Sequence, residues 1–304
     1  MSPSARRAAL SVVPVAMIAA AIAGCGSSGG GSSTTAGGGG KVSVTTDKTI
    51  AAQVPAAVKK KGTLKVAADA TYAPNEFVGT NGKTIMGMDV DLGQALGKVM
   101  GLNASFVNAN FDSIIPGLAA HKYDLGMSSF TDTKEREKTV DFVTYFSAGT
   151  SFYVKSAGGP TINTLADLCG HRVAAEKGTT QVDDASKQAK KCKASGKAAV
   201  KILVFPDQNG VNLALQSGRA DVGMADSPVV AYQVKKTGGQ FKVTGKTYGT
   251  APYGIAVPKG SGLAKPLLAA LKVLMKNGQY KAILTKWGIE AGAISNPTIN
   301  GATS

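Results

Sequence analysis

Leu64-Lys65-Val66-Ala67-Ala68-Asp69 begins the part of the chain that decides the fold. A mostly apolar run that ends in an acid predicts a short buried strand with a polar side chain at its carboxyl end. A helix is predicted over 89–100, because apolar residues recur there at helical spacing and Gly101 follows as a C-cap signal. Further along, the pattern predicts a strand over 104–107, a helix over 113–121 and a strand over 125–128. This alternation favours an α/β fold with a parallel sheet covered by helices.

The helix over 113–121 contains a proline. Proline lacks a backbone N–H and is tolerated in the first turn of a helix, where that group has no intrahelical partner. We therefore expect the helix to begin near Ser113, so that Pro116 falls in its first turn.

The opening strand has a second copy later in the chain. The matching segments are Val66-Ala67-Ala68-Asp69 with Val173-Ala174-Ala175-Glu176, and Asp124-Leu125-Gly126-Met127 with Asp221-Val222-Gly223-Met224. Five residues past the aspartate of the second pair lie Ser129 in one copy and Asp226 in the other. Two similar α/β units are therefore expected. Each would present polar side chains at the carboxyl ends of its strands, where open α/β sheets bind ligands.

The N-terminus carries an export signal pattern. Arg6 and Arg7 precede an apolar stretch over 8–23, which is typical of a secretory signal peptide. Ile22-Ala23-Gly24-Cys25 resembles the lipobox of bacterial lipoproteins, in which the cysteine is lipidated and becomes the new N-terminus. The alternative is a plain signal peptide with an incidental cysteine.

A stretch of glycine, serine, threonine and alanine follows over 26–40 and predicts a flexible tether. The expected division is a signal peptide over 1–24 and a lipid-anchored tether over 25–45. The protein would then lie outside the cytoplasm, anchored to the outer face of the cytoplasmic membrane.

The chain is basic, with a formal net charge of +15 from 34 Lys and Arg against 19 Asp and Glu. Such a charge can indicate nucleic-acid binding, but the lysines are dispersed, no basic-aromatic cluster occurs, and export removes that partner. We interpret the charge as a solvated surface with weak attraction to an anionic cell envelope.

Two cysteines remain after Cys25, namely Cys169 and Cys192. In an oxidising compartment a disulfide is the expected state. Closing a loop of about 24 residues contributes about 3.4 kcal/mol in the chain-entropy model. A metal or redox pair is the alternative, but His121 and His171 are the only histidines and no C-x-x-C occurs. No metal and no cofactor are therefore expected.

Several ordered blocks carry a family resemblance. They are Ala68-Asp69-Ala70-Thr71-Tyr72-Ala73-Pro74, Gly87-Met88-Asp89-Val90-Asp91-Leu92, Phe111-Asp112-Ser113-Ile114-Ile115-Pro116-Gly117-Leu118, Ser128-Ser129-Phe130-Thr131-Asp132-Thr133-Lys134-Glu135-Arg136, Val140-Asp141-Phe142, Lys177-Gly178-Thr179-Thr180-Gln181 and Tyr253-Gly254-Ile255-Ala256-Val257-Pro258-Lys259-Gly260. From Gly62 to Gly288 the chain resembles the bacterial solute-binding proteins of family 3, the polar amino acid binders of ABC importers. Asn75 departs from the apolar residue usual after the proline, and the sequence does not say what this changes.

The resemblance implies a two-lobed, periplasmic-binding-protein-like fold whose lobes are joined by two strands. These hinge strands would lie near 150–154 and 248–253, and the last helices, over 263–287, would return to the first lobe. The implied boundaries are 46–151 plus 251–290 for lobe one, 152–250 for lobe two and 291–304 for a C-terminal tail.

The resemblance also implies how a free amino acid is held. Arg136 stands where the family places its carboxylate-binding arginine, and a guanidinium offers the bidentate fork that a carboxylate needs. Thr179 and Thr180 open a helix whose N-terminal N–H groups would clamp the same carboxylate. The alternatives are a solvated arginine within the charged run 134–138 and simple N-capping by the threonines.

Asp226 is the expected acceptor for the ligand ammonium, aided by Thr131 and the Ser129 carbonyl. The ligand side chain is expected between Tyr72 and Phe111, although either aromatic could be an ordinary core residue.

Asp69 and Glu176 are the equivalent strand-end acids of the two copies. With Arg136 and Asp226 they give a pocket of net charge −2, which suits a ligand with an extra positive charge: arginine, lysine, ornithine or histidine. Glutamine-binding relatives carry a lysine where Glu176 aligns. If Glu176 instead points to solvent, Asp69 alone could take an amide and glutamine would fit.

Two other functions, an enzyme and a sensor domain, are less consistent with the sequence. Some relatives are dehydratases or lytic enzymes, but a hydrolase would need a nucleophile–base pair, and His121 and His171 both look structural. A sensor domain would need a membrane span and an effector after Trp287. We therefore expect a monomeric binding protein, not an enzyme, whose partners are an amino acid and the membrane subunits of an ABC permease.

Overall fold

The structure, a computed structural model, describes residues 44–303. The predicted signal peptide, Cys25 and nearly all of the predicted tether lie outside the described residues. Within 44–303, no helix combines the length and the apolar character that crossing a membrane would require.

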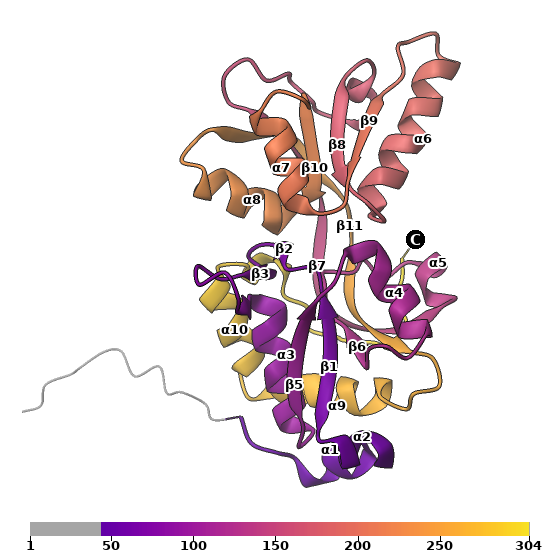
Figure 1. Ribbon diagram of the computed structural model, residues 1–304, viewed down its shortest axis with the longest axis vertical. Helices are drawn as coiled ribbons and strands as arrows, with labels where there is room; N and C mark the ends of the chain where they lie inside the picture. The colour runs from indigo at the N-terminus through magenta and orange to yellow at the C-terminus, as the bar shows by residue number, and fades with distance from the viewer. Residues whose placement is uncertain (1–43, 304) are drawn as a thin grey trace, which may run out of the picture. The chain divides into compact units, whose positions relative to one another are not determined.

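One eight-stranded sheet runs through the structure (Figure 1). Its strands, in spatial order, are β5 (Asn103–Asn108), β1 (Thr63–Ala68), β6 (Leu125–Gly126), β11 (Phe241–Pro258), β7 (Val140–Lys155), β10 (Val222–Asp226), β8 (Arg172–Glu176) and β9 (Lys201–Phe205). β1 pairs in parallel with β5 and β6, and β8 pairs in parallel with β9 and β10. The two halves therefore have the same local topology, as the sequence repeat predicts.

β7 and β11 pair antiparallel with each other and join the two halves (Figure 1). We call the half with β1, β5 and β6 the first lobe, and the half with β8, β9 and β10 the second. The expected hinge segments lie inside these strands, which are longer than predicted. Their register shifts between Thr244 and Tyr248 and between Tyr248 and Ala251. The two-lobed α/β fold is confirmed; the residue boundaries of the lobes stay a prediction.

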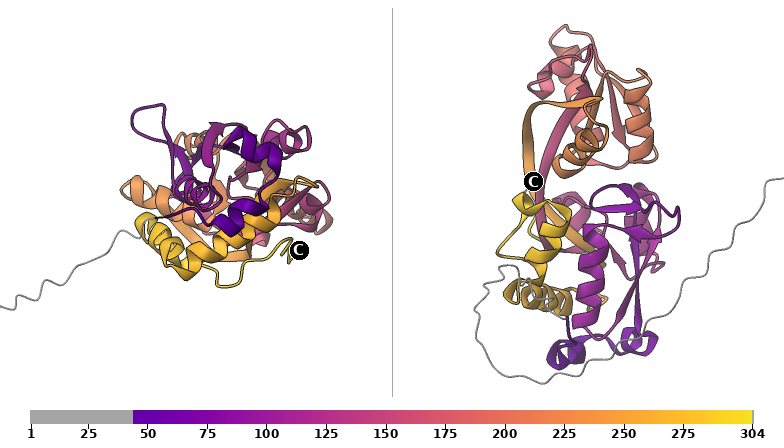
Figure 2. Two further views of the ribbon diagram at one scale, coloured as in Figure 1. Left: turned by 90° about the horizontal axis from the view of Figure 1, so that it is seen from below. Right: turned by 90° about the vertical axis from the view of Figure 1, so that its left-hand side faces the viewer.

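Helices cover both faces of the sheet in each lobe because alternate strand residues point to opposite faces. In the first lobe, Val66 packs with α1 (Lys48–Gln53), α3 (Met88–Val99), α9 (Ala264–Lys276) and α10 (Gln279–Trp287), whereas Ala67 packs with α4 (Phe111–Ala119). The short α2 (Ala56–Lys61) precedes β1. The views of Figure 2 show α9 and α10 returning to the first lobe, as expected.

In the second lobe, Val173 and Ala175 pack with α6 (Thr180–Ala194). Ala174 packs on the other face with α7 (Gln208–Gln216) and α8 (Ser227–Lys236). The smaller elements are α5 (Lys134–Glu137), the 3₁₀ helices η1 (Leu165–Leu168) and η2 (Glu290–Gly292), and a sheet of β2 (Thr71–Tyr72), β3 (Glu76–Val78) and β4 (Ile85–Met86).

The predicted start of α4 is wrong. The helix begins at Phe111 rather than near Ser113, so Pro116 lies inside it and not in its first turn. The helix is short and mostly apolar, and Ile114 and Leu118 are fully buried against the sheet. Burial of this face outweighs the loss of the N–H donor at Pro116. Sequence rules alone would have placed this proline nearer the helix start.

The predicted disulfide is present. Cys169 follows η1 and Cys192 lies on α6, with 5.6 Å between their Cα atoms. The bond ties the loop before β8 to the far end of α6, within the core shared by Leu168 and Ala185.

Candidate functional site

A small cavity lies where the carboxyl ends of β1 and β6 face those of β8 and β10. Its volume is only about 10 Å³, so the residues that line it lie almost in contact. All ten residues that the sequence assigned to ligand contact line it: Asp69, Tyr72, Phe111, Ser129, Thr131, Arg136, Glu176, Thr179, Thr180 and Asp226. The structure therefore brings the whole set together, and which group of a ligand each one meets stays a prediction.

Arg136 lies on an aromatic platform. Phe111 and Phe130 stack with 4.5 Å between ring centroids, and the guanidinium carbon of Arg136 is 5.3 and 5.6 Å from the two rings. Nη1 donates to the backbone oxygen of Thr131 at 2.8 Å, and Nη2 donates to that of Gly178 at 3.0 Å. Burial lowers the pKa of Arg136, but an arginine side chain stays charged in proteins. This arginine is thus an oriented, half-buried cation rather than a solvated member of its charged run.

Arg136 is carried by a helix of one turn. Thr133 is the N-cap of α5, and its hydroxyl accepts a hydrogen bond of 3.2 Å from the backbone N–H of Arg136. None of the four α5 residues is buried. Such a short helix is not stable by itself, so its direction depends on the contacts at its two ends.

The N-terminus of α6 faces Arg136 from the second lobe. Thr179 is its N-cap residue, but the Thr179 hydroxyl donates to the backbone oxygen of Glu176 and makes no cap hydrogen bond. The alternative of simple N-capping is therefore not realised by this side chain, which leaves the first-turn N–H groups of this 15-residue helix open to an anion. Gly178 has φ +81°, and a Cβ there would lie 2.9 Å from Asp112 Cβ, so only glycine permits this approach of the lobes.

Asp226 is buried at the end of β10. Its carboxylate accepts from the Tyr253 hydroxyl at 2.7 Å and from Gln181 Nε2 at 2.8 Å. Its backbone N–H donates to the Tyr72 hydroxyl at 3.0 Å. Burial raises the pKa of Asp226, while its hydrogen bonds and Arg136 oppose that rise. The carboxylate is fixed by neutral donors and keeps acceptor capacity for a cation.

Asp69 and Glu176 meet across the two lobes. Both are buried, with 3% and 2% of their surface exposed. Asp69 accepts from the Thr71 hydroxyl at 2.7 Å and from the Phe111 N–H at 3.1 Å. Among the described residues, Glu176 Oε1 has no donor, and the nearby Asp69 carboxyl can bond to it only if a proton lies between them. Burial, followed by the charge of Asp69, raises the pKa of Glu176 well above its ordinary value. Glu176 therefore does not point to solvent.

Ser129 has a left-handed backbone, with φ +53°. Its N–H donates to Asp89 at 3.1 Å and its hydroxyl donates to Glu76 at 3.1 Å. Asn75, whose role the sequence left open, donates from Nδ2 to the Ser129 hydroxyl at 2.9 Å. These buried contacts hold a backbone conformation that is costly for a residue with a side chain.

The carboxyl groups of Glu76 and Asp89 lie beneath Ser129, are fully buried and share a hydrogen bond. Burial and the charge of Asp89 raise the pKa of Glu76, and burial raises the pKa of Asp89 to about 6. Tyr145 completes the group by donating to Asp89 at 2.7 Å.

Sequence reasoning missed three residues of the site. Ser128 and Gln181 line the cavity, and Tyr253 orients Asp226. Ser128 and Gln181 adjoin predicted residues in the quoted blocks, so their position was a usable signal. The role of Tyr253 depends on where the β11 strand passes the second lobe, which no local pattern reveals.

A larger cleft, of about 870 Å³, lies beside the joining strands and is lined by residues of both lobes, including Phe146, Thr250 and Trp287. It contains none of the predicted site residues and no acidic side chain. We place the functional site in the smaller cavity, because the charged and oriented groups converge there. In residues 44–303, no cluster of three or more histidine, cysteine or acidic side chains could hold a metal ion.

Comparison with known proteins gives a consistent result. The sequence profile of the bacterial extracellular solute-binding proteins, family 3, matches residues 64–290. The arginine-binding protein ArgT of Corynebacterium glutamicum is 35% identical over 252 residues, which cover 83% of this chain and 82% of the relative. The ABC transporter arginine-binding protein 1 of Escherichia coli K12 is 34% identical over 224 residues, which cover 72% of this chain and 87% of the relative.

Solved structures agree. An ancestral arginine-binding protein bound to arginine has a TM-score of 0.69 and 38% identity, over 74% of this chain and 98% of that one. An ancestral arginine-binding protein bound to glutamine has a TM-score of 0.69 and 37% identity, over 75% of this chain and 99% of that one. An ancestral amino acid-binding protein that is a precursor of cyclohexadienyl dehydratase has a TM-score of 0.68 and 36% identity, over 76% of this chain and 97% of that one.

Proposed function

Because this chain belongs to the bacterial extracellular solute-binding proteins of family 3, we propose that it binds a cationic amino acid, arginine foremost, by closing its two lobes around it. The ligand would then be delivered to the membrane subunits of an ABC importer. Lysine, ornithine and histidine share the same chemistry.

The carboxylate of the ligand is assigned to Arg136 and the N-terminus of α6. The guanidinium donates to the Thr131 and Gly178 backbone oxygens, which uses two of its five N–H donors and leaves three for an anion. Thr180 and Gln181, in the first turn of α6, line the same cavity. A cation from one lobe and a helix N-terminus from the other make carboxylate binding depend on closure.

The ammonium of the ligand is assigned to Asp226, Ser129 and Thr131. The donors that bind the Asp226 carboxylate, Gln181 and Tyr253, are neutral. A ligand ammonium would therefore add a second positive charge near this carboxylate, after that of Arg136. The Ser129 hydroxyl is already engaged by Glu76 and Asn75, so the acceptor that we assign on this residue is its backbone carbonyl.

The observation that carries the proposal is the buried pair Asp69 and Glu176. Two carboxyl groups from opposite lobes lie together, and Glu176 Oε1 has no donor in the described part of the chain. An unpaired buried charge costs several kcal/mol. A guanidinium or ammonium on the ligand side chain would satisfy both groups at once.

Glutamine is the second candidate, because one of the similar structures, an ancestral arginine-binding protein, has glutamine bound. Its amide could donate to Asp69 or Glu176 but would not neutralise them. We therefore propose that glutamine binds more weakly than arginine and that glutamate is rejected by like-charge repulsion.

Catalysis is not part of the proposal. The relatives above carry the names of binding proteins, and the dehydratase precursor among the structures is itself an amino acid-binding protein.

Calorimetric titration of the purified protein tests the assignment, with arginine, lysine, ornithine, histidine, glutamine and glutamate as ligands. We expect the cationic set to bind most tightly and glutamate to give no heat. Tight glutamine binding without binding of the cationic set would overturn the cationic assignment and leave amino acid binding in place.

We also propose that Cys25 is lipidated and anchors the protein outside the cytoplasm. The lipobox and the tether over 26–40 support this. In cells, Cys25→Ala should move the protein from the membrane fraction to the soluble fraction or block its processing. Unchanged membrane retention and unchanged mass would contradict the anchor.

A further inference from the structure

The C-terminal segment does not end where the family match ends. The matched range stops at residue 290, but the chain continues and runs back along β7. We call Thr298–Ala302 the strap. It makes a bridge between Ile299 and Val143, and the Thr144 N–H donates to the Thr298 oxygen at 2.9 Å.

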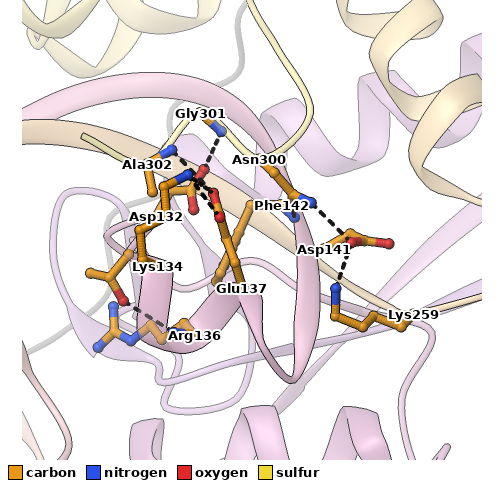
Figure 3. A network of polar contacts seen from close by, with 11 residues as sticks. Asp132, Lys134, Arg136, Glu137, Asp141, Phe142, Lys259, Asn300, Gly301 and Ala302 are labelled. Atoms are coloured by element: carbon orange, nitrogen blue, oxygen red, sulfur yellow. Dashed lines mark hydrogen bonds and ion pairs between the residues drawn. The ribbon is translucent and has the colours of Figure 1, made fainter. Parts of the chain in front are cut away.

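Asn300 fastens the strap to the start of β7. Its backbone N–H donates to the Phe142 oxygen at 2.9 Å, and its side-chain oxygen accepts from the Phe142 N–H at 2.8 Å. Its Nδ2 also donates to Asp141, which pairs with Lys259 (Figure 3). Asn300 has φ +56°, a conformation that asparagine tolerates better than most residues.

The end of the strap holds the turn that carries Arg136. The Gly301 N–H donates to Asp132 at 2.8 Å, and the Ala302 N–H donates to Glu137 at 3.2 Å. Figure 3 shows Gly301 and Ala302 above these two acids, with Arg136 lower on the same turn. A Cβ on Gly301 would lie 2.5 Å from the Thr298 hydroxyl and 3.0 Å from Thr144 Cγ2, so glycine lets the strap fold on itself and lie against β7.

The Asp132 carboxyl depends on the hydrogen bond that it accepts from the strap. The Asp132 side chain is fully buried, and burial raises its pKa to about 6, while the Gly301 N–H lowers it. Its own backbone N–H donates to the Pro252 oxygen at 2.8 Å. Without the strap, the Asp132 and Glu137 carboxyl groups would lose a backbone donor each.

We propose that the strap is a positioning element for Arg136, so that residues beyond the family match set the strength of carboxylate binding. The inference rests on the proposed role of Arg136. Because α5 buries none of its residues and cannot hold its own direction, the strap fixes the turn and, through it, the guanidinium.

Two variants test this. The first ends the chain after Pro297, and the second, Asn300→Ala, unfastens the strap from Phe142 without touching the Arg136 turn. Thr303→Ala, at an exposed position just past the strap, is the matched control. Dissociation constants are measured for arginine and for agmatine, which is arginine without its carboxylate.

We expect the truncation to weaken arginine binding about tenfold or more, since small losses of order in a binding group are costly. Agmatine binding should change by less than about threefold, because that ligand has no carboxylate for Arg136. Asn300→Ala should give a smaller loss of the same kind, and Thr303→Ala none. Equal losses for both ligands, or no loss for arginine, would overturn the proposal.

Hydrogen exchange gives a readout that needs no ligand. Amides over 131–139 should exchange faster in both variants, while those of α7 in the second lobe should not change. Equal acceleration in both regions would indicate general destabilisation and overturn a local role. Arg136→Ala separates the two proposals: if it binds arginine normally, the carboxylate assignment fails, and if it fails to bind while the truncation binds normally, only the strap is wrong.

Discussion

Arg136 of the first lobe donates a hydrogen bond of 3.0 Å to the backbone oxygen of Gly178 in the second lobe. The same guanidinium rests on Phe111 and Phe130. Arg136 therefore contacts the residue just before the N-cap of α6, and the geometry of the groups assigned to the ligand carboxylate can be tested one residue at a time.

Arg136→Ala should lower arginine affinity by about 3–5 kcal/mol, or about two to three and a half orders of magnitude in Kd, because a buried anion would lose its counter-charge. Arg136→Lys keeps the charge but not the fork and should lose about tenfold. Calorimetry checks both, with Arg172→Ala, on the second-lobe surface beside Asp221, as control. Affinity of Arg136→Ala within a few-fold of wild type would show that the arginine is not a ligand group.

Glu176→Gln should change the selectivity of the cavity. Removing one of the two buried acids leaves Asp69 with an amide neighbour, so arginine should weaken by about 10²-fold while glutamine weakens less or improves. The measurement is the ratio of the two dissociation constants. Glu135→Gln, an exposed acid on α5, should leave that ratio unchanged. An unaltered ratio in Glu176→Gln would remove this glutamate from the specificity site.

Arginine binding should release protons. Burial and neighbouring acids raise the pKa of Glu176, and burial raises that of Asp69, so these groups keep protons above their ordinary pKa values in the free protein. A ligand cation favours their ionised forms. Affinity should therefore rise with pH from about 4.5 upward and level off once the free carboxyl groups are ionised.

Titrations from pH 5 to 8, in buffers with different ionisation enthalpies, count those protons. The charged groups that face Glu176 are Asp69, Asp207 and Asp226, so Glu176→Gln should reduce the release without abolishing it. Proton uptake on binding would contradict a cationic partner for these acids.

Replacing both cysteines, Cys169→Ser with Cys192→Ser, should lower the free energy of unfolding by about 3.4 kcal/mol, the value for a loop of about 24 residues. Ligand affinity should change little, because Cys192 lies twelve residues along α6 from Thr180, about 18 Å from the helix start. Chemical denaturation and calorimetry measure the two effects. A large loss of affinity without loss of stability would show that the disulfide positions α6 instead.

Local patterns in the sequence determined much of this protein. Apolar runs ending in Asp69 and Glu176 predicted β1 and β8, because a buried strand and its polar end are properties of neighbouring residues. The repeat predicted equivalent topologies, and the family resemblance identified ten of the twelve residues that line the cavity. The disulfide followed from two cysteines left in an oxidising compartment.

The tertiary structure decided what depends on contacts between distant segments. Tyr253 meets Asp226 because β11 passes between the lobes, and Asn75 lies under Ser129 because β3 folds back beside it. The start of α4 was set by burial against the sheet rather than by Pro116. The strap is the clearest case: nothing in Thr298–Ala302 predicts a partner, because its hydrogen bonds come from backbone groups, and which side chain a backbone N–H meets is fixed only when the chain has folded.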